Sequence, residues 1–228
     1  MAYIQIHMSN RLYDMRTERT IIDLLESKLY PDICSEPVRW YNNMTDQLKG
    51  KDCDLFFDDL TAESVDVKCA HDYVKTDLLE CSLPTFAFEL SFLSGGSEKQ
   101  GWLYDTSKET KYYLLSWMWA KKKKDIELED ILKLECCLVE RQKILYFLAI
   151  RGLYPKNAAE INRKIRRSGR DGQHMSRNIK RDLQDIDMER GFHFYYSKDA
   201  KEEKPINVII YKKHLLELAS KTFDLHME

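Results

Sequence analysis

The 228-residue chain lacks a long uninterrupted apolar run, since no stretch approaches the roughly 20 residues that a membrane-spanning helix needs. Its first residues contain neither an apolar signal-peptide core nor a small-residue cleavage site, so we expect a cytoplasmic protein with no membrane partner. With 43% hydrophobic residues, the chain has enough apolar side chains to fold, which excludes disorder as its dominant state. Its length suits one large domain or a medium domain with a small appendage.

The chain also lacks the cysteine spacing of a structural zinc site. Its six cysteines include no CxxC pair and no matching Cys/His pair, and they lie in apolar segments. We therefore expect buried thiols and neither disulfides nor zinc. Strongly basic character is missing too, because 36 Lys and Arg residues balance 38 Asp and Glu residues, for a formal net charge of −2. Any nucleic-acid contact must come from a local basic patch.

The residues that are present divide into two stretches at the lysine run 121–124. Before this run, residues 15–30 carry apolar side chains at helical spacing and Pro31 follows, so we expect a helix that stops there. Short segments rich in β-branched and aromatic residues come next, which predicts a mixed sheet and an α/β domain over residues 1–120. The expected strands lie at residues 37–43, 51–59, 63–73, 84–93, 101–105 and 111–119.

After the lysine run, the pattern changes to helical periodicity followed by a pair of alternating segments. Three helices and a hairpin are the outline of a winged helix, so we expect a smaller helical, winged-helix-like domain over residues 125–228. The expected helices lie at residues 125–152, 157–169, 174–187 and 213–221, and the expected strands at residues 192–197 and 206–212.

One segment of the first stretch carries a pattern that suggests chemistry. Because side chains alternate along a strand, Asp66 and Lys68 point to the same face of the strand expected at residues 63–73. If the preceding segment pairs with this strand as a hairpin, Asp52 comes close, and two carboxylates and one lysine converge. Two carboxylates can hold Mg²⁺, which polarises a phosphodiester and activates a bound water. The lysine can orient that water and offset charge on the phosphate.

This arrangement resembles the PD-(D/E)XK nuclease superfamily, whose signature is an acid, a hairpin, and then acid-x-lysine on the adjoining strand. Asp52, Asp66 and Lys68 match these positions in order, although no proline precedes Asp52. The resemblance covers about residues 10–120 and includes an early helix that carries Glu18. It implies a restriction-endonuclease-like fold, a central mixed β-sheet flanked by helices. It also implies that Asp52 and Asp66 bind the metal, that Lys68 acts at the water and that Glu18 adds a metal-facing acid.

The residues leave alternatives to this site open. Asp54 has the same strand parity as the predicted first acid and is its main rival. Glu89 interrupts an apolar strand, which suits either a further site acid or a position on an edge strand. Asp66 and Lys68 alone would also suit an ordinary surface ion pair, and His71 is more typical of a strand end than of a catalytic group.

The second stretch is locally basic. Between residues 141 and 181, twelve Lys and Arg residues accompany only two acidic residues, Glu160 and Asp171. This asymmetry indicates a nucleic-acid-binding face, with a solvated helix surface as the alternative. On the expected third helix, four residues at i, i+3, i+4 and i+7 form a stripe suited to base edges and phosphates, namely His174, Arg177, Asn178 and Arg181.

Together these features predict a divalent-metal-dependent nuclease that hydrolyses phosphodiester bonds with Mg²⁺, or with Mn²⁺ as a substitute. DNA is the expected partner, as for restriction, phage and defence-related endonucleases, although the sequence does not distinguish DNA from RNA. One alternative is a catalytically inactive nucleic-acid-binding or regulatory protein on the same fold. Another is a protein-interaction module of the anti-defence type. The sequence is also compatible with a homodimer.

Overall fold

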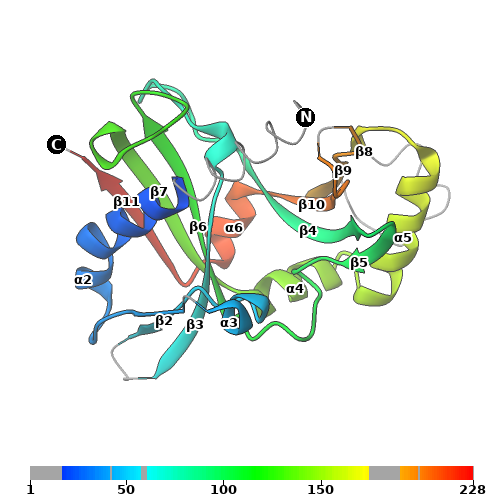
Figure 1. Ribbon diagram of the computed structural model, residues 1–228, viewed down its shortest axis with the longest axis horizontal. Helices are drawn as coiled ribbons and strands as arrows, with labels where there is room; N and C mark the ends of the chain where they lie inside the picture. Colours follow the sequence, from blue (N-terminus) through cyan, green and yellow to red (C-terminus); the bar gives the residue numbers. More distant parts are fainter. Residues whose placement is uncertain (1–16, 42, 58–60, 175–190, 200, 228) are drawn as a thin grey trace. The chain divides into compact units, whose positions relative to one another are not determined.

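The computed structural model describes residues 17–41, 43–57, 61–174, 191–199 and 201–227. The chain folds into two units, and each is assembled from segments that are distant in the sequence (Figure 1). The first unit contains residues 1–83, 110–139 and 219–228, and the second contains residues 84–109 and 140–218.

The first unit is built on a six-stranded sheet. In spatial order its strands are β1 (Arg39–Trp40), β2 (Cys53–Phe56), β3 (Ala62–Cys69), β6 (Tyr112–Ala120), β7 (Ile131–Glu140) and β11 (Lys221–His226). β3 and β6 run parallel, whereas β1–β2, β2–β3 and β7–β11 are antiparallel pairs. The sheet is therefore mixed, which confirms the expected α/β class with a central mixed sheet.

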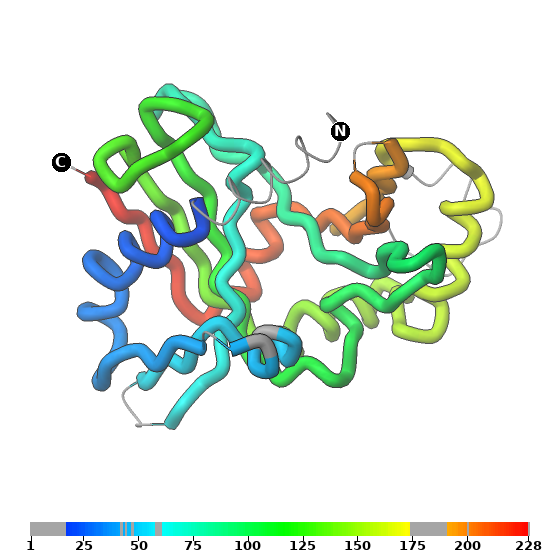
Figure 2. Tube along the Cα trace, in the orientation of Figure 1, coloured from blue at the N-terminus to red at the C-terminus, as the bar shows by residue number. Residues whose placement is uncertain are grey.

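A helix formed by residues 17–28 lies across one face of this sheet (Figure 2). Its apolar residues Ile21, Leu24 and Leu25 are buried in one core cluster with strand residues such as Val65. The helix ends before Pro31, as the sequence predicts, because proline cannot continue it. The remaining short helices of this unit are α2 (Tyr30–Ile33), α3 (Met44–Leu48) and the 3₁₀ turns η1 (His71–Tyr73) and η2 (Leu128–Asp130).

The second unit is built on an antiparallel five-stranded sheet. In spatial order its strands are β5 (Ser97–Gln100), β4 (Thr85–Ser94), β10 (Ile206–Tyr211), β9 (Phe192–Tyr196) and β8 (Gly172–His174). Three helices, α4 (Arg141–Ala149), α5 (Pro155–Ser168) and α6 (Lys212–Leu218), belong to this unit. Alternate residues of β9 and β10 are buried, so one face of the sheet forms the core.

The ends of α5 follow from local sequence. Pro155 occupies the first turn, where a missing N–H costs no helical hydrogen bond, and Asn157 caps the backbone N–H of Tyr154. Gly169 ends the helix with φ +65°, in the left-handed region that favours glycine. The helix expected at residues 157–169 is thus confirmed. None of the helices in the described ranges is long and apolar enough to cross a membrane.

The single helix expected at residues 125–152 is wrong. The structure instead has strand β7 up to Glu140 and then helix α4 from Arg141. β7 lies between β6 and β11, and a strand buried in the interior of a sheet carries a nearly continuous apolar run. Such a run cannot be distinguished from a buried helix by periodicity alone.

Two shorter expectations are also wrong. Residues 101–105 form no strand, and β5 lies just before them, paired with β4 around a turn at Gly95 and Gly96. Both glycines have positive φ, which suits a tight hairpin. The helix expected at residues 213–221 ends at Leu218, and β11 follows it and pairs with β7.

The division of the chain differs from the boundary expected near residues 121–124. β4, which the sequence assigns to the domain of residues 1–120, pairs with β10 in the second unit. β7 and β11, expected in the domain of residues 125–228, join the first sheet instead. Because sheet partners here are distant in the sequence, no single cut separates the two units.

Candidate active site

The hairpin of β2 and β3 brings together the residues that the sequence singles out. The two strands pair antiparallel, with Cys53 opposite Val65. The N–H of Asp52 donates to the carbonyl of Val65 at 3.0 Å, and the N–H of Val67 donates to Oδ2 of Asp52 at 2.8 Å. The carboxylate of Asp52 therefore lies against β3 beside Asp66, as the predicted hairpin requires.

Asp66 and Lys68 form a direct ion pair on the same side of β3. Asp66 is only 4% exposed, which distinguishes it from an acid on a solvent-facing sheet. Burial raises the pKa of Asp66 to about 7, against the opposing effect of Lys68 and with a further contribution from the like charge of Asp52. Two carboxyl groups thus share a restricted space next to one ammonium group.

Lys68 remains a cation in this environment. Burial alone would lower the pKa of its ammonium group, but Asp66 and Asp52 outweigh that effect and hold the pKa above its ordinary value. Glu18, from the helix of residues 17–28, acts in the same direction. Lys68 is therefore equipped to supply fixed positive charge and is poorly suited to accept a proton.

A pocket of about 250 Å³ opens at this cluster. Glu18, Asp52 and Lys68 all line it, so three of the four predicted site residues of the first unit face one space, while Asp66 is buried against Lys68. The remaining lining side chains are Ile21, Ile22, Trp40, Tyr41, Val67, Cys69 and His71.

Asp54, the rival first acid, has a different environment. It is 6% exposed and accepts a hydrogen bond of 2.5 Å from the hydroxyl of Tyr41. Lys51 and Arg39 lie 3.8 Å and 3.9 Å from its carboxylate oxygens. Asp54 is thus engaged in holding Tyr41, whereas Asp52 lines the pocket. The geometry favours Asp52 as the first acid.

Three residues with aromatic side chains line the pocket without being among the predicted site residues, namely Trp40, Tyr41 and His71. Trp40 reaches the site because β1 pairs with β2 opposite Cys53, and Tyr41 follows it. His71 begins the 3₁₀ turn after β3, and its Nε2 lies 3.6 Å from Asp72. β1 has only two residues, too few to show a periodic pattern, so the only available signal was the adjacent pair of aromatic residues.

The chemistry of the acids allows a test for a metal ion. Mg²⁺ is usually held by one or two carboxylates and keeps several waters. Asp52 and Asp66 supply two, and a cation would favour the charged form of Asp66, whose pKa is raised mainly by burial and also by the like charge of Asp52. Within the described ranges, no group of three or more His, Cys, Asp or Glu side chains is placed to hold a metal ion. If Mg²⁺ bound to Asp52 and Asp66, water would have to supply most of its remaining ligands.

Of the predicted nucleic-acid stripe, only His174 lies among the described residues. His174 is the last residue of β8, so it does not begin a helix as expected. Arg177, Asn178 and Arg181 lie outside the described residues. Glu89, the suggested further acid, lies on β4 in the second unit and between β5 and β10, so it is not on an edge strand.

Part of the basic segment in the second unit has a structural role. Arg141 is 8% exposed and donates to the carbonyls of Leu103, Asp105 and Lys108. Arg166 donates to Ser91 at 3.0 Å. These two side chains hold loops and strands of their own unit together.

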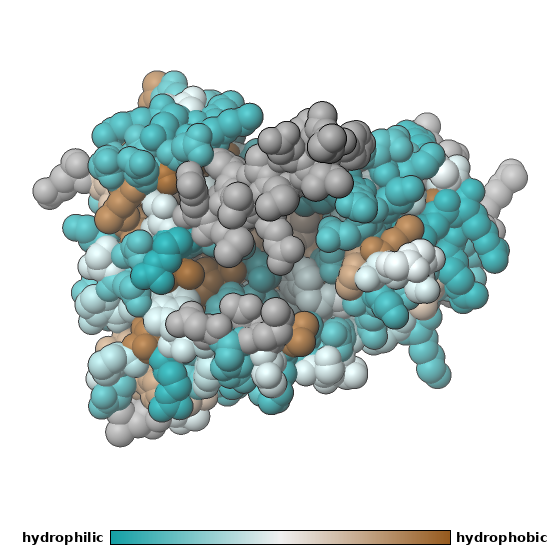
Figure 3. All heavy atoms as spheres, in the orientation of Figure 1, coloured by the Kyte–Doolittle hydropathy of each residue, from teal (hydrophilic) through white to brown (hydrophobic). Residues whose placement is uncertain are grey.

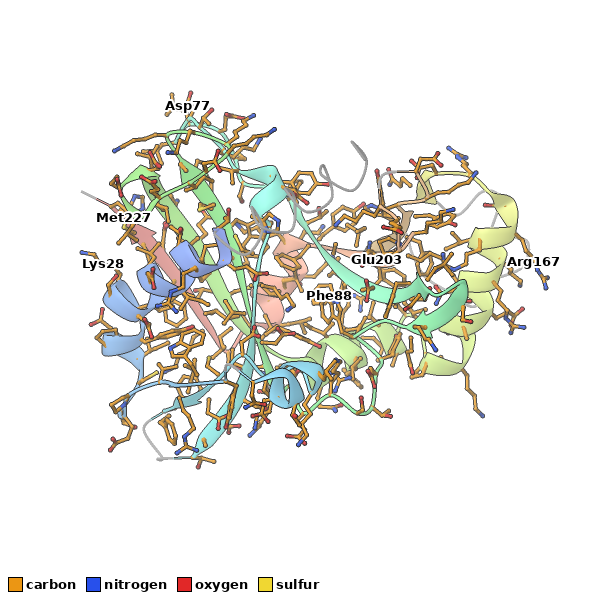
Figure 4. The ribbon with its side chains drawn as sticks, viewed as in Figure 1. Lys28, Asp77, Phe88, Arg167, Glu203 and Met227 are labelled. Carbon is orange, nitrogen blue, oxygen red and sulfur yellow. The ribbon has the colours of Figure 1, made fainter. Side chains whose placement is uncertain are left out.

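A second group of basic side chains faces the solvent. Lys156, Arg163 and Arg167 are exposed along α5, and Figure 4 shows Arg167 pointing away from the helix. Hydrophilic side chains cover the surface over α5 in Figure 3. These three side chains form a cationic face of α5, and the acid between them, Glu160, is paired with Lys164.

Comparison of the chain with protein-family models, curated proteins and solved structures finds no match in any of the three.

Proposed function

We propose that the protein is a divalent-metal-dependent nuclease that hydrolyses phosphodiester bonds in DNA, with its active site at the hairpin of β2 and β3. The observation that carries the proposal is the convergence of Asp52 and Lys68 at one pocket, with Asp66 buried directly behind them and paired with Lys68. These are the three positions at which the chain resembles the PD-(D/E)XK superfamily, and the mixed sheet with a helix on one face is compatible with its restriction-endonuclease-like arrangement.

Each residue has a role that follows from its environment. Asp52 and Asp66 would hold Mg²⁺, or Mn²⁺ in its place, and Glu18, which lines the same pocket, would add a further acid on the metal side. The bound ion would polarise the phosphate and lower the pKa of a water. Lys68, held protonated by its acidic neighbours, offsets negative charge as it builds on the phosphate oxygens. Because Lys68 pairs with Asp66, positioning one of these groups also positions the other.

The second unit supplies the surface that would hold the substrate. The exposed cationic face of α5 carries Lys156, Arg163 and Arg167, whose charges suit a phosphate backbone. We extend the proposal to the winged-helix-like arrangement of α4, α5, β8 and the β9–β10 hairpin. The predicted binding residues Arg177, Asn178 and Arg181 belong to this part of the proposal.

The test is a cleavage assay on supercoiled plasmid, linear duplex, single-stranded DNA and RNA, each with Mg²⁺, Mn²⁺ or EDTA. The parent should cut at least one DNA substrate in a metal-dependent way, and Asp66→Asn should not. Lys133→Met is a matched control, because Lys133 also forms ion pairs on the same sheet, with Glu135 and Asp224. Salt-sensitive DNA binding without cleavage would select the inactive nucleic-acid-binding alternative. Neither cleavage nor binding would select the protein-interaction alternative.

A further inference from the structure

The pocket that contains the acids and the lysine also has an aromatic wall. Trp40 and Tyr41 line it together with Asp52 and Lys68, and all four residues belong to the first unit. An active site that recognised only a phosphate would need charge and hydrogen-bond donors but no aromatic rings. The two rings therefore call for a ligand that also has an apolar, flat part.

Both rings are held in place by neighbouring groups. Nε1 of Trp40 donates to Glu26 at 2.5 Å, and the ring lies 6.0 Å from that of Tyr30. The hydroxyl of Tyr41 donates to Asp54, and the ammonium group of Lys51 lies 4.6 Å from the centre of the Tyr41 ring. A ring that is fixed before the ligand arrives loses little conformational entropy on binding.

Tyr41 is also linked to the acidic end of the pocket. Its backbone N–H donates to the carbonyl of Asp52 at 2.9 Å. The aromatic wall and the first acid are therefore adjacent parts of one hydrogen-bonded framework, so a ligand that contacts both must carry its flat part and its phosphate close together. A nucleotide has this composition.

We propose that Trp40 and Tyr41 form a base-binding wall, so that the pocket takes a single unstacked nucleotide with its base against the rings and its phosphate toward Asp52 and Lys68. This inference rests on the proposed nuclease function and names its substrate class, which is single-stranded or frayed DNA. A base inside a duplex is stacked on both faces and cannot reach the rings without being extruded. Stacking on aromatic side chains tolerates any base, so the wall selects for strandedness and not for sequence.

The size of the pocket agrees with this assignment. Pockets for drug-sized ligands begin at about 300 Å³, and this one has about 250 Å³. It is therefore too small for a stack of several nucleotides. The phosphate would face Asp52 and Glu18, so its binding depends on a cation, whereas contact between base and rings does not.

The experiment measures binding of a labelled oligothymidylate of about 12 nucleotides, and of the corresponding duplex, to the full chain in EDTA. Trp40→Leu keeps an apolar side chain beside Tyr30 but removes the ring. It should weaken binding of the single strand about ten-fold or more and change duplex binding less than about two-fold. Trp40→Phe should restore most of the affinity. Tyr146→Leu is the matched control, since Tyr146 is 67% exposed and lies on α4 in the second unit.

A second measurement does not depend on a variant that loses the ring. Thymidine 5′-monophosphate should quench the tryptophan fluorescence of the parent to saturation and should quench Trp40→Phe much less. Of the other three tryptophans, Trp117 and Trp119 are each only 2% exposed, and the half-buried Trp102 belongs to the second unit and does not line the pocket. If the mononucleotide binds as tightly as the oligonucleotide, the source of the ligand is a free nucleotide. If the oligonucleotide binds at least ten-fold more tightly, the source is a strand.

The inference is overturned if Trp40→Leu and Trp40→Phe bind single strands like the parent and the mononucleotide causes no quenching that depends on Trp40. Its failure is distinguishable from failure of the proposed function. Metal-dependent cleavage that needs Asp66 but is indifferent to Trp40 would retain the nuclease and reject the base-binding wall. Binding that depends on Trp40, without cleavage under any condition, would retain the base-binding wall and reject the nuclease.

Discussion

Each unit of the molecule holds a cationic side chain in a site with little water, buried for Arg141 and half-buried for Lys68, but the two cations are compensated in different ways. In the second unit, the guanidinium group of Arg141 donates to three backbone carbonyls, which are neutral and fixed. In the first unit, the ammonium group of Lys68 contacts Asp66, which is itself crowded by Asp52. Arg141 completes a hydrogen-bond network, whereas Lys68 belongs to a cluster of charges that still has unrelieved repulsion.

If the proposed function holds, this difference separates the structural charge of Arg141 from the functional charge of Lys68. Hydrogen bonds from a buried cation to carbonyls stabilise one arrangement, and nothing further is gained by adding a ligand. In contrast, the electrostatic energy of two acids and one lysine at a pocket would become more favourable if a cation and an anionic substrate entered together. Substitution of Lys68 should therefore mainly reduce catalysis, whereas substitution of Arg141 should mainly reduce stability.

The largest effect is expected for Lys68→Met on cleavage. Loss of the fixed positive charge should reduce the cleavage rate by about a hundredfold or more. Stability should change by less than about 1 kcal/mol near pH 5.5, because Asp66, with a pKa of about 7, is already mostly protonated there and leaves no buried charge without a partner. Cleavage kinetics and urea denaturation measure the two quantities. Lys133→Met should leave the rate unchanged, and full activity in Lys68→Met would refute the assigned role.

Arg141→Met should show the reverse pattern, with a loss of about 3 kcal/mol in the free energy of unfolding. The carbonyl of Leu103, a fully buried residue, would lose its hydrogen-bond donor, and methionine has no N–H or O–H group to replace it. Lys143→Met on the same helix is the control, since the side chain of Lys143 is 42% exposed and forms an ion pair with the neighbouring Glu140. Equal denaturation midpoints for Arg141→Met and Lys143→Met would show that the network does not stabilise the unit.

The sequence predicted a helix or strand correctly where residues within that segment determine it. The helix ended by Gly169 needed only its glycine, and β2 and β3 needed only their alternation. The pairing of β4 with β10 and of β11 with β7 could not be predicted in this way. These pairs join residues about 120 and 90 positions apart, and strand alternation contains no information about which distant strand is the partner.

The candidate site was predictable to a similar degree. Strand parity placed Asp66 beside Lys68, and the hairpin placed Asp52 near both. Parity could not distinguish Asp52 from Asp54, because the choice depends on Tyr41 and Lys51, which engage Asp54 through tertiary contacts. Trp40 was missed for the same reason, since it reaches the pocket through a pairing of only two residues.

The next effect concerns the pH dependence of stability. Since the pKa of Asp66 is raised to about 7 in the folded chain, from an ordinary value of 3.8, the folded state binds more protons than the unfolded state between these pH values. The free energy of unfolding should therefore fall as pH rises from about 4 to about 7, by an amount on the order of a few kcal/mol. Denaturation series should show this fall in the parent and a weaker one in Asp66→Asn. The same slope in both proteins would contradict the raised pKa.

The smallest effect is a thermal shift that separates the two rival acids. Mg²⁺ at ten times its dissociation constant stabilises the folded chain by about 1.4 kcal/mol, which corresponds to a melting temperature about 3–6 °C higher. Asp52→Asn should lose most of this shift, because it removes one of two metal-binding carboxylates. Asp54→Asn should retain the shift but melt at a lower temperature, because the hydroxyl of Tyr41 loses its charged acceptor. A retained shift in Asp52→Asn together with a lost one in Asp54→Asn would assign the metal to Asp54. The absence of any shift in the parent would remove the metal from the site and leave Lys68 paired with Asp66 as a structural ion pair.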